Sequence, residues 1–206
     1  KEAFPPLEVG RSLVVMAPWH KGKEVRGRIP LYIYPGSAFG TGYHESTQVA
    51  LELLEDTVRP GMKVIDVGTG SGILAVASLK MGAVGVIATD NDPAVVPEVR
   101  ENLRLNDIPD GVVDIRTGDL LGGISETADL VSANIVFDPL ASMMPVIPKV
   151  LPEEGIAVFS GLVLKERERF LEILPKAGLV PIGEKEKGDW WGVAASRTAG
   201  LVGPRG

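Results

Sequence analysis

The chain has 206 residues, of which 45% are hydrophobic, and this length and composition suit one globular domain with a substantial core. It contains no cysteine, which excludes disulfide scaffolds, thiolate catalysis, Cys-ligated zinc and iron–sulfur clusters. With 21 basic and 27 acidic residues the net charge is −6, which disfavours a broad nucleic-acid-binding face, because phosphate neutralisation requires clustered Lys and Arg.

Targeting signals are not visible in the sequence. No apolar run approaches the roughly 20 residues needed to cross a bilayer, and the start, KEAFPPLEVG, lacks the apolar core of a signal peptide. We therefore expect a soluble, non-secreted, cytoplasmic protein with no membrane partner, and we predict no metal site.

Residues 1–40 are expected to form a lead-in segment that is too small to be a domain. Two short apolar stretches, Leu13–Met16 and Ile29–Tyr34, lie between Pro and Gly breakers and a basic loop over residues 20–28. This pattern predicts a hairpin or an extended segment. His20, in the basic loop, is expected to be solvated.

Residues 41–196 are expected to form one domain in which strands and helices alternate. The first helix is predicted over Thr47–Val58, with Ser46 or Thr47 as its cap, and Pro60-Gly61 ends it. Alternation implies a mostly parallel sheet with helices on both faces. The last two strands, joined around Lys187-Gly188, must be antiparallel to each other. Strands are predicted over 62–67, 84–89, 112–117, 129–136 and 155–161 and twice within 179–196, helices over 72–81, 93–106, 138–151 and 165–177, and an aperiodic tail over 197–206.

A glycine-rich turn follows the first strand of this domain, in the sequence VIDVGTGSGILA. Gly68, Gly70 and Gly72 let the backbone approach a ligand closely, and the following helix offers free N–H groups. The dinucleotide fingerprint requires a glycine where Ile73 stands, and a phosphate loop requires Gly-Lys-Ser/Thr, which this turn lacks. Both phosphate-binding interpretations are therefore weakened.

Acidic residues at the strand ends favour a ligand that carries positive charge. Asp66 precedes the glycines, and S-adenosylmethionine carries an ammonium and a sulfonium, so a carboxylate here suits this cofactor. Asp90, 22 residues after Gly68, can accept hydrogen bonds from both ribose hydroxyls. Asp119, after the third strand, is expected near the adenine. For any one of these aspartates alone, a helix cap or a solvated turn is the simpler interpretation.

Four segments together resemble the PrmA family of ribosomal protein methyltransferases: AFGTGYHEST, VIDVGTGSGILAVASLKMGA, TDNDP and SANIV. The resemblance extends from about Phe4 to Ser196, and AFGTG-x-H-x-x-T is far more specific than the glycines alone. It implies a Rossmann-like class I methyltransferase fold, an α/β fold whose seven-stranded, mostly parallel sheet ends in an antiparallel hairpin. Matching positions imply cofactor contacts from Thr47, Gly68, Asp90 and Asn134.

The resemblance also implies the reaction and its partner. Members of this family use S-adenosyl-L-methionine to methylate lysine or amino-terminal amines of a large-subunit ribosomal protein, and they release S-adenosyl-L-homocysteine. The family normally has a separate amino-terminal domain that docks the ribosomal substrate, and the chain before Phe39 is too short to contain it. The substrate could therefore be another protein or a small-molecule amine, or the core could bind cofactor without activity. Nicotinamide-dependent oxidoreduction is a third possibility, which Ile73 disfavours.

The segment FGTGYHEST and the end of the fourth strand are the candidate catalytic regions. Phe39 can cover the methionine end of the cofactor as a flap, with plain packing equally compatible. His44 invites a general-base role, but a hydrogen bond that fixes the loop is the favoured interpretation. Asn134 can accept a hydrogen bond from the cofactor ammonium or from an incoming amine, or it can cap a turn.

The residues after Asn134 bear on the substrate. Amide and adenine methyltransferases carry Asn-Pro-Pro-Tyr or Phe here, whereas this chain has Asn-Ile-Val-Phe, so we rank an aliphatic amine above a flat amide or base. In the final hairpin, Trp190 and Trp191 should point to opposite faces, with packing favoured over substrate stacking.

Overall fold

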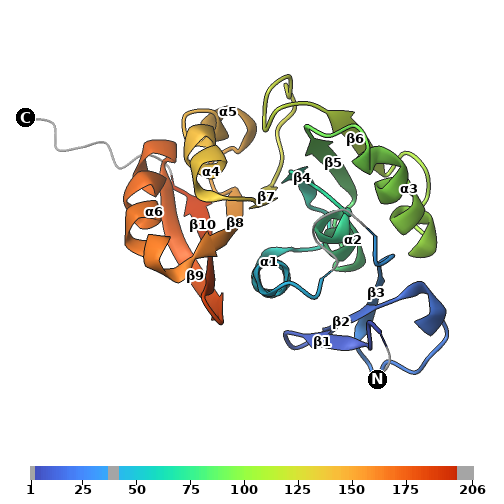
Figure 1. Cartoon of the computed structure of the whole chain (residues 1–206). Helices are drawn as coiled ribbons and strands as arrows, with labels where there is room; N and C mark the ends of the chain where they lie inside the picture. Colours follow the sequence, from blue (N-terminus) through green and yellow to red (C-terminus); the bar gives the residue numbers. More distant parts are fainter. Residues whose placement is uncertain (1–2, 37–41, 199–206) are drawn as a thin grey trace, which may run out of the picture.

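A computed structural model describes residues 3–36 and 42–198, and its centre is a seven-stranded sheet (Figure 1). The strand order is β6-β5-β4-β7-β8-β10-β9. The strands are β4 (Lys63–Val67), β5 (Gly85–Asp90), β6 (Val113–Thr117), β7 (Leu130–Asn134), β8 (Ile156–Val163), β9 (Leu179–Lys187) and β10 (Trp190–Arg197). All pairings from β6 to β8 are parallel, whereas β10 is antiparallel to both β8 and β9. The predicted fold class, including the antiparallel final hairpin, is confirmed.

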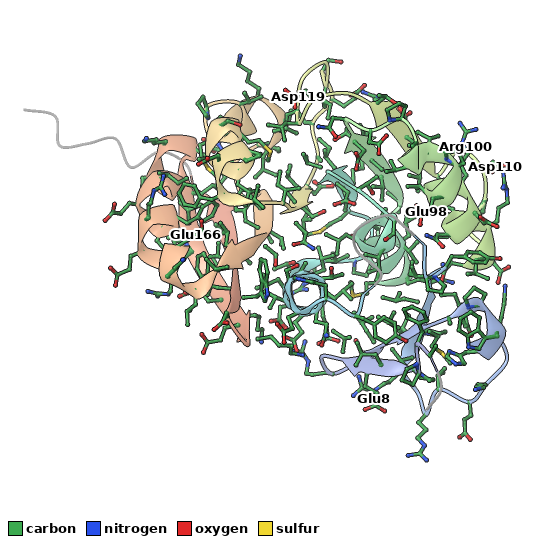
Figure 2. The ribbon with its side chains drawn as sticks, in the orientation of Figure 1. Glu8, Glu98, Arg100, Asp110, Asp119 and Glu166 are labelled. Carbon is green, nitrogen blue, oxygen red and sulfur yellow. The ribbon has the colours of Figure 1, made fainter. Side chains whose placement is uncertain are left out.

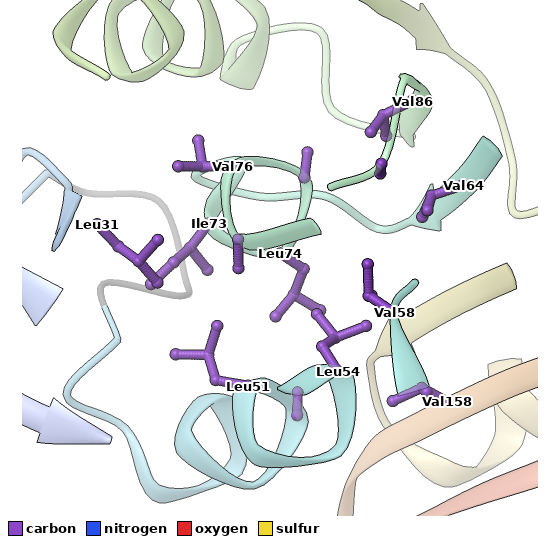
Figure 3. Close-up of a cluster of buried hydrophobic side chains, with 14 of the residues drawn as sticks. Leu31, Leu51, Leu54, Val58, Val64, Ile73, Leu74, Val76, Val86 and Val158 are labelled. Atoms are coloured by element: carbon purple, nitrogen blue, oxygen red, sulfur yellow. The ribbon is translucent and has the colours of Figure 1, made fainter. Parts of the chain in front are cut away.

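Helices cover both faces of this sheet and enclose two hydrophobic clusters. The first cluster contains side chains of α1 (Glu45–Thr57), α2 (Ile73–Lys80) and α3 (Val95–Leu105). In Figure 3, Leu54 of α1 lies beside Leu74 of α2 within this cluster. The second cluster contains side chains of α4 (Phe137–Met143), α5 (Ile147–Val150) and α6 (Arg167–Ile173). The glycine-rich turn and the carboxyl ends of the parallel strands are thus held between two packed layers.

The lead-in forms a small separate sheet of β1 (Leu7–Val9), β2 (Leu13–Met16) and β3 (Ile29–Tyr32). The two predicted apolar stretches form β2 and β3, which pair in parallel, so they do not form a hairpin with each other. β2 instead forms an antiparallel hairpin with β1, a strand that the sequence analysis did not predict. The prediction that His20 is solvated is wrong, because His20 is fully buried at the end of the short helix η1 (Pro18–His20). Its Nδ1 accepts a hydrogen bond from the backbone N–H of Ala17 at 3.1 Å.

Two predicted helices are shorter and more broken than expected. The helix predicted over 138–151 is divided into α4 and α5 around Pro145, since proline has no N–H to donate. The helix predicted over 165–177 consists of η2 (Leu164–Glu166), α6 and η3 (Leu174–Ala177). No helix in the described part of the chain is long and apolar enough to cross a membrane.

The first helix of the domain begins two residues earlier than predicted. α1 begins at Glu45, and its cap is His44, whose Nδ1 accepts a hydrogen bond from the N–H of Ser46 at 3.2 Å. A capping role for Ser46 or Thr47 is therefore wrong, and both are fully buried inside the first turn. Trp191 is buried and Trp190 half-buried, so the predicted division of this pair between the two faces is confirmed.

Candidate cofactor-binding site

Residues 68–72, here called the glycine loop, connect the end of β4 to the start of α2. Gly68, Gly70 and Gly72 have φ values of +67°, +55° and +84°, which residues with a Cβ rarely adopt. A Cβ at Gly68 would also lie 2.7 Å from Cγ2 of Ile135. The loop thus folds sharply at the carboxyl edge of the sheet and leaves no side chain at its first position.

Asp66 lies beneath the glycine loop and is 1% exposed. Its Oδ2 accepts a hydrogen bond from the hydroxyl of Thr69 at 2.7 Å, and its Oδ1 accepts one from the hydroxyl of Ser132 at 2.8 Å. Burial raises the pKa of Asp66 to about 6, although these two hydrogen bonds act in the opposite direction. Asp66 therefore ties the loop to β7 from below, and its contact with a cofactor stays a prediction.

Asp90 is the last residue of β5 and closes the glycine loop from the side. Its Oδ2 accepts a hydrogen bond from the N–H of Gly70 at 3.0 Å, and its Oδ1 accepts one from the N–H of Asp92 at 3.0 Å. Carboxylate oxygens have more than two acceptor positions between them, so Asp90 can still accept hydrogen bonds from a ligand.

A cavity of about 420 Å³ opens beside Asp90 at the carboxyl edge of the sheet. Asp119 reaches it from the loop between β6 and β7, where Figure 2 labels it. Gly68, Asp90 and Asp119, three of the predicted residues, are thus brought together. The sequence analysis did not assign Asn91, Asp138 or Ser142 to the site, and only the position of Asn91 directly after the end of β5 could have indicated it. The lining consists of Gly68, Asp90, Asn91, Gly118, Asp119, Leu120, Ile135, Asp138, Pro139 and Ser142.

Asn134, at the end of β7, lies on the α1 side of this edge. Its Nδ2 donates a hydrogen bond to Oγ1 of Thr47, which is fully buried, at 3.2 Å. Its Oδ1 is buried and has no hydrogen-bond partner in residues 3–36 and 42–198. A buried acceptor without a donor is costly in a folded protein, and it suits a site where a ligand supplies the donor.

The segment before α1 is only partly covered by the structure, and Phe39 lies outside the described residues. His44 bonds to Ser46 at the start of α1, which agrees with its loop-fixing interpretation. Its ring also makes an edge-on contact with Trp190, with 4.7 Å between the ring centroids. No group of three or more His, Asp or Glu side chains in the described ranges is arranged to hold a metal ion.

The comparison with family models decides the affiliation of the chain. Residues 1–198 match the model described as Ribosomal protein L11 methyltransferase (PrmA). The chain belongs to the PrmA family. Among PrmA relatives, the ribosomal protein L11 methyltransferase of Symbiobacterium thermophilum is 38% identical over 197 residues, which cover 96% of this chain and 64% of the relative. The corresponding protein of Heliobacterium modesticaldum is 36% identical over 96% of this chain and 62% of its own length. The chain thus spans less than two thirds of these PrmA relatives.

Solved structures agree with the PrmA assignment. The ribosomal protein L11 methylase from Lactobacillus delbrueckii subsp. bulgaricus superposes with a TM-score of 0.86 at 31% identity, covering 94% of this chain and 99% of that chain. A methyltransferase from Pyrococcus furiosus gives a TM-score of 0.62 at 18% identity, over 71% of this chain and 80% of that chain. The second likeness concerns the fold alone.

Proposed function

We propose that this chain is the catalytic core of an S-adenosylmethionine-dependent protein methyltransferase that methylates lysine or amino-terminal amines of ribosomal protein L11. The observation that carries the proposal is the glycine loop closed by Asp90 beside the 420 Å³ cavity. Membership of the PrmA family supports the same reaction. A substrate of this kind is made in the cytoplasm, so we place the reaction there.

Four residues of the site fit S-adenosylmethionine. Asp90 retains acceptor capacity for the ribose hydroxyls, and Asp119 lies in the same cavity for the amino group of the adenine. Gly68 leaves backbone exposed where a Cβ would meet Ile135. The unpartnered Oδ1 of Asn134 suits an N–H donor, either the ammonium of the cofactor or the substrate amine. When bound, the cofactor supplies a methyl group on a sulfonium, which is already a good leaving group.

The residues of the chain then have a positioning task. Asn134 is held by Thr47, so its Oδ1 has a fixed direction and can orient an amine by accepting one of its N–H bonds. A lysine must be neutral to attack, and its deprotonation at pH 7 costs about 4–5 kcal/mol from a reference pKa near 10.4. Burial of the substrate amine against Asn134 would lower that cost by disfavouring the ammonium. We assign no general base, and the proton passes to solvent.

The test is transfer of a labelled methyl group from S-adenosylmethionine to purified ribosomal protein L11. We expect Asn134→Ala to lower the rate about 100-fold, because a misplaced amine loses its alignment. The matched control is Ser78→Ala on α2, which removes a second buried side-chain oxygen that has no hydrogen-bond partner among the described residues. This control should transfer label at the wild-type rate.

Two results would count against the proposal. Equal rates for Asn134→Ala and wild type would remove Asn134 from the reaction. If wild-type protein bound labelled cofactor and transferred no methyl group to the ribosomal protein, the chain would be a cofactor-binding core that acts on another amine or is inactive.

A further inference from the structure

Three polar residues follow one another at every fourth position on one side of α3: Glu98 and Asn102 within the helix and Asn106 as its C-cap, here called the α3 stripe. Residues four apart lie on the same side of a helix and are separated by about 6 Å along its axis. In Figure 2, Glu98 lies on the side of α3 toward α2, whereas Arg100 lies on the outer side. The α3 stripe therefore faces the interior of the protein.

The segment that continues from β3 passes along this stripe in an extended conformation. Asn106 accepts a hydrogen bond from the N–H of Tyr32 at 2.9 Å and donates one to its carbonyl at 2.6 Å. Asn102 accepts one from the N–H of Tyr34 at 3.0 Å. Two residues of extended chain span about 6.6 Å, close to the 6 Å between neighbours on the helix, so the two contacts stay in register.

Asn102 makes a second contact that Asn106 does not make. Its Nδ2 donates a hydrogen bond to the carbonyl of Ser71, inside the glycine loop, at 2.8 Å. Asn102 is fully buried. Val99, three residues earlier on α3, packs against Gly72, where an added Cβ would lie 3.0 Å from its Cγ1. The side chain of Asn102 thus joins the glycine loop to the lead-in at Tyr34.

We propose that Asn102 is a positioning residue that couples the glycine loop to the lead-in, so that a ligand held by the loop also fixes the backbone at Tyr34. The inference rests on the proposed function, because it takes the glycine loop as part of the cofactor site. Coupling between two sites is reciprocal. Loss of this link should therefore lower the affinity for the ligand and also free the backbone at Tyr34.

The two asparagines of the stripe offer matched variants. Asn102→Asp keeps an acceptor for the N–H of Tyr34 and replaces the donor to Ser71 with an oxygen. Asn106→Asp likewise keeps an acceptor for the N–H of Tyr32 and removes donors to the carbonyls of Tyr32 and Asn102. Both changes remove a buried donor from the α3 stripe, but only the first one touches the glycine loop.

The experiment is calorimetric titration with S-adenosylhomocysteine, combined with amide hydrogen exchange measured by NMR. For Asn102→Asp we expect the affinity to fall roughly 3- to 30-fold, the range seen for mutations that modulate coupling between sites. Asn106→Asp should bind within about twofold of wild type. In wild type, ligand should raise the protection of the Tyr34 amide, and Asn102→Asp should lose that increase.

The outcomes separate this inference from the proposed function. If wild type fails to bind S-adenosylhomocysteine, the proposed function fails. If wild type binds and both variants bind equally, Asn102 does not position the loop. Should Asn102→Asp not fold, exchange in wild type alone decides the matter, because unchanged protection of Tyr34 on ligand addition overturns the coupling.

Discussion

Asp66 is a carboxyl group that the fold buries, and it has no cationic partner among residues 3–36 and 42–198. Both of its oxygens accept hydrogen bonds from hydroxyls, one from Thr69 in the glycine loop and one from Ser132 on β7. Neutral hydroxyls compensate a buried negative charge only partly, so burial raises the pKa of Asp66 to about 6. The loop that forms one side of the site thus rests on a group that titrates near neutral pH.

This pKa predicts a pH dependence of stability. A carboxyl whose pKa is raised on folding binds more protons in the native state than in the unfolded state between about pH 4 and pH 6. The free energy of unfolding should therefore fall as pH rises through this window. A change from 3.8 to about 6 in the pKa is worth about 3 kcal/mol as an upper limit.

Urea unfolding between pH 4 and pH 7 measures this effect. The side chain introduced by Asp66→Asn cannot ionise. The difference in unfolding free energy between wild type and this variant should therefore change by up to about 3 kcal/mol between about pH 4 and pH 6. A difference that stays constant with pH would show that Asp66 does not titrate there.

At the scale of elements, the small lead-in sheet is fastened to α1 by two carboxylates, Asp56, which pairs with Arg11 at 2.8 Å, and Glu55, which makes more of the contacts. Glu55 accepts hydrogen bonds from the backbone N–H of Arg11 at 2.9 Å and from the N–H and hydroxyl of Ser12 at 2.8 and 2.5 Å. Burial disfavours the ionised form, but these hydrogen bonds outweigh it and lower the pKa of Glu55. The position of the turn between β1 and β2 therefore depends on the ionised carboxylate of Glu55 on α1.

Replacing Glu55 should loosen this turn, which Arg11 still joins to Asp56. We expect Glu55→Ala to lower the free energy of unfolding by about 2 kcal/mol, since hydrogen bonds to a charged, partly buried group are lost. The matched control on the same helix is Glu52→Ala, which removes only a 3.9 Å ion pair with Lys187 and should cost less than about 0.5 kcal/mol. Equal losses in urea unfolding would contradict this role of Glu55.

The sequence predicted most elements, and it missed those that depend on distant partners or on local proline chemistry. Every strand from β4 to β10 falls within its predicted range or within two residues of it. Buried parallel strands such as β4 and β7 are apolar runs, and the short turn at Lys187-Gly188 marks the antiparallel pair β9 and β10. Pro145 was visible in the sequence, yet the surrounding apolar residues still suggested one helix. His20 was assigned to solvent from its basic neighbours, whereas local capping inside η1 buries it.

At the scale of the whole molecule, the strand order assembles the candidate site. β4 lies between β5 and β7, so the glycine loop, Asp90 and Asn134 emerge side by side although Asn134 is far from the others in sequence. The carboxyl-edge location followed from the sequence alone. Two hydrogen bonds could be found only from the tertiary structure, because their partners come from elements far apart in the chain. They join Asn134 to Thr47 and Ser132 to the buried Asp66.

The most direct test of the central claim is a crystal structure of the chain with S-adenosylhomocysteine. We predict the ribose at Asp90, the adenine beside Asp119 and the sulfur directed toward Asn134, in the cavity that begins at Gly68. A ligand bound elsewhere would contradict the account, for instance in the cavity between α3 and β6 near Arg100 and Asp110 (Figure 2). An empty carboxyl-edge cavity at saturating ligand would contradict it equally.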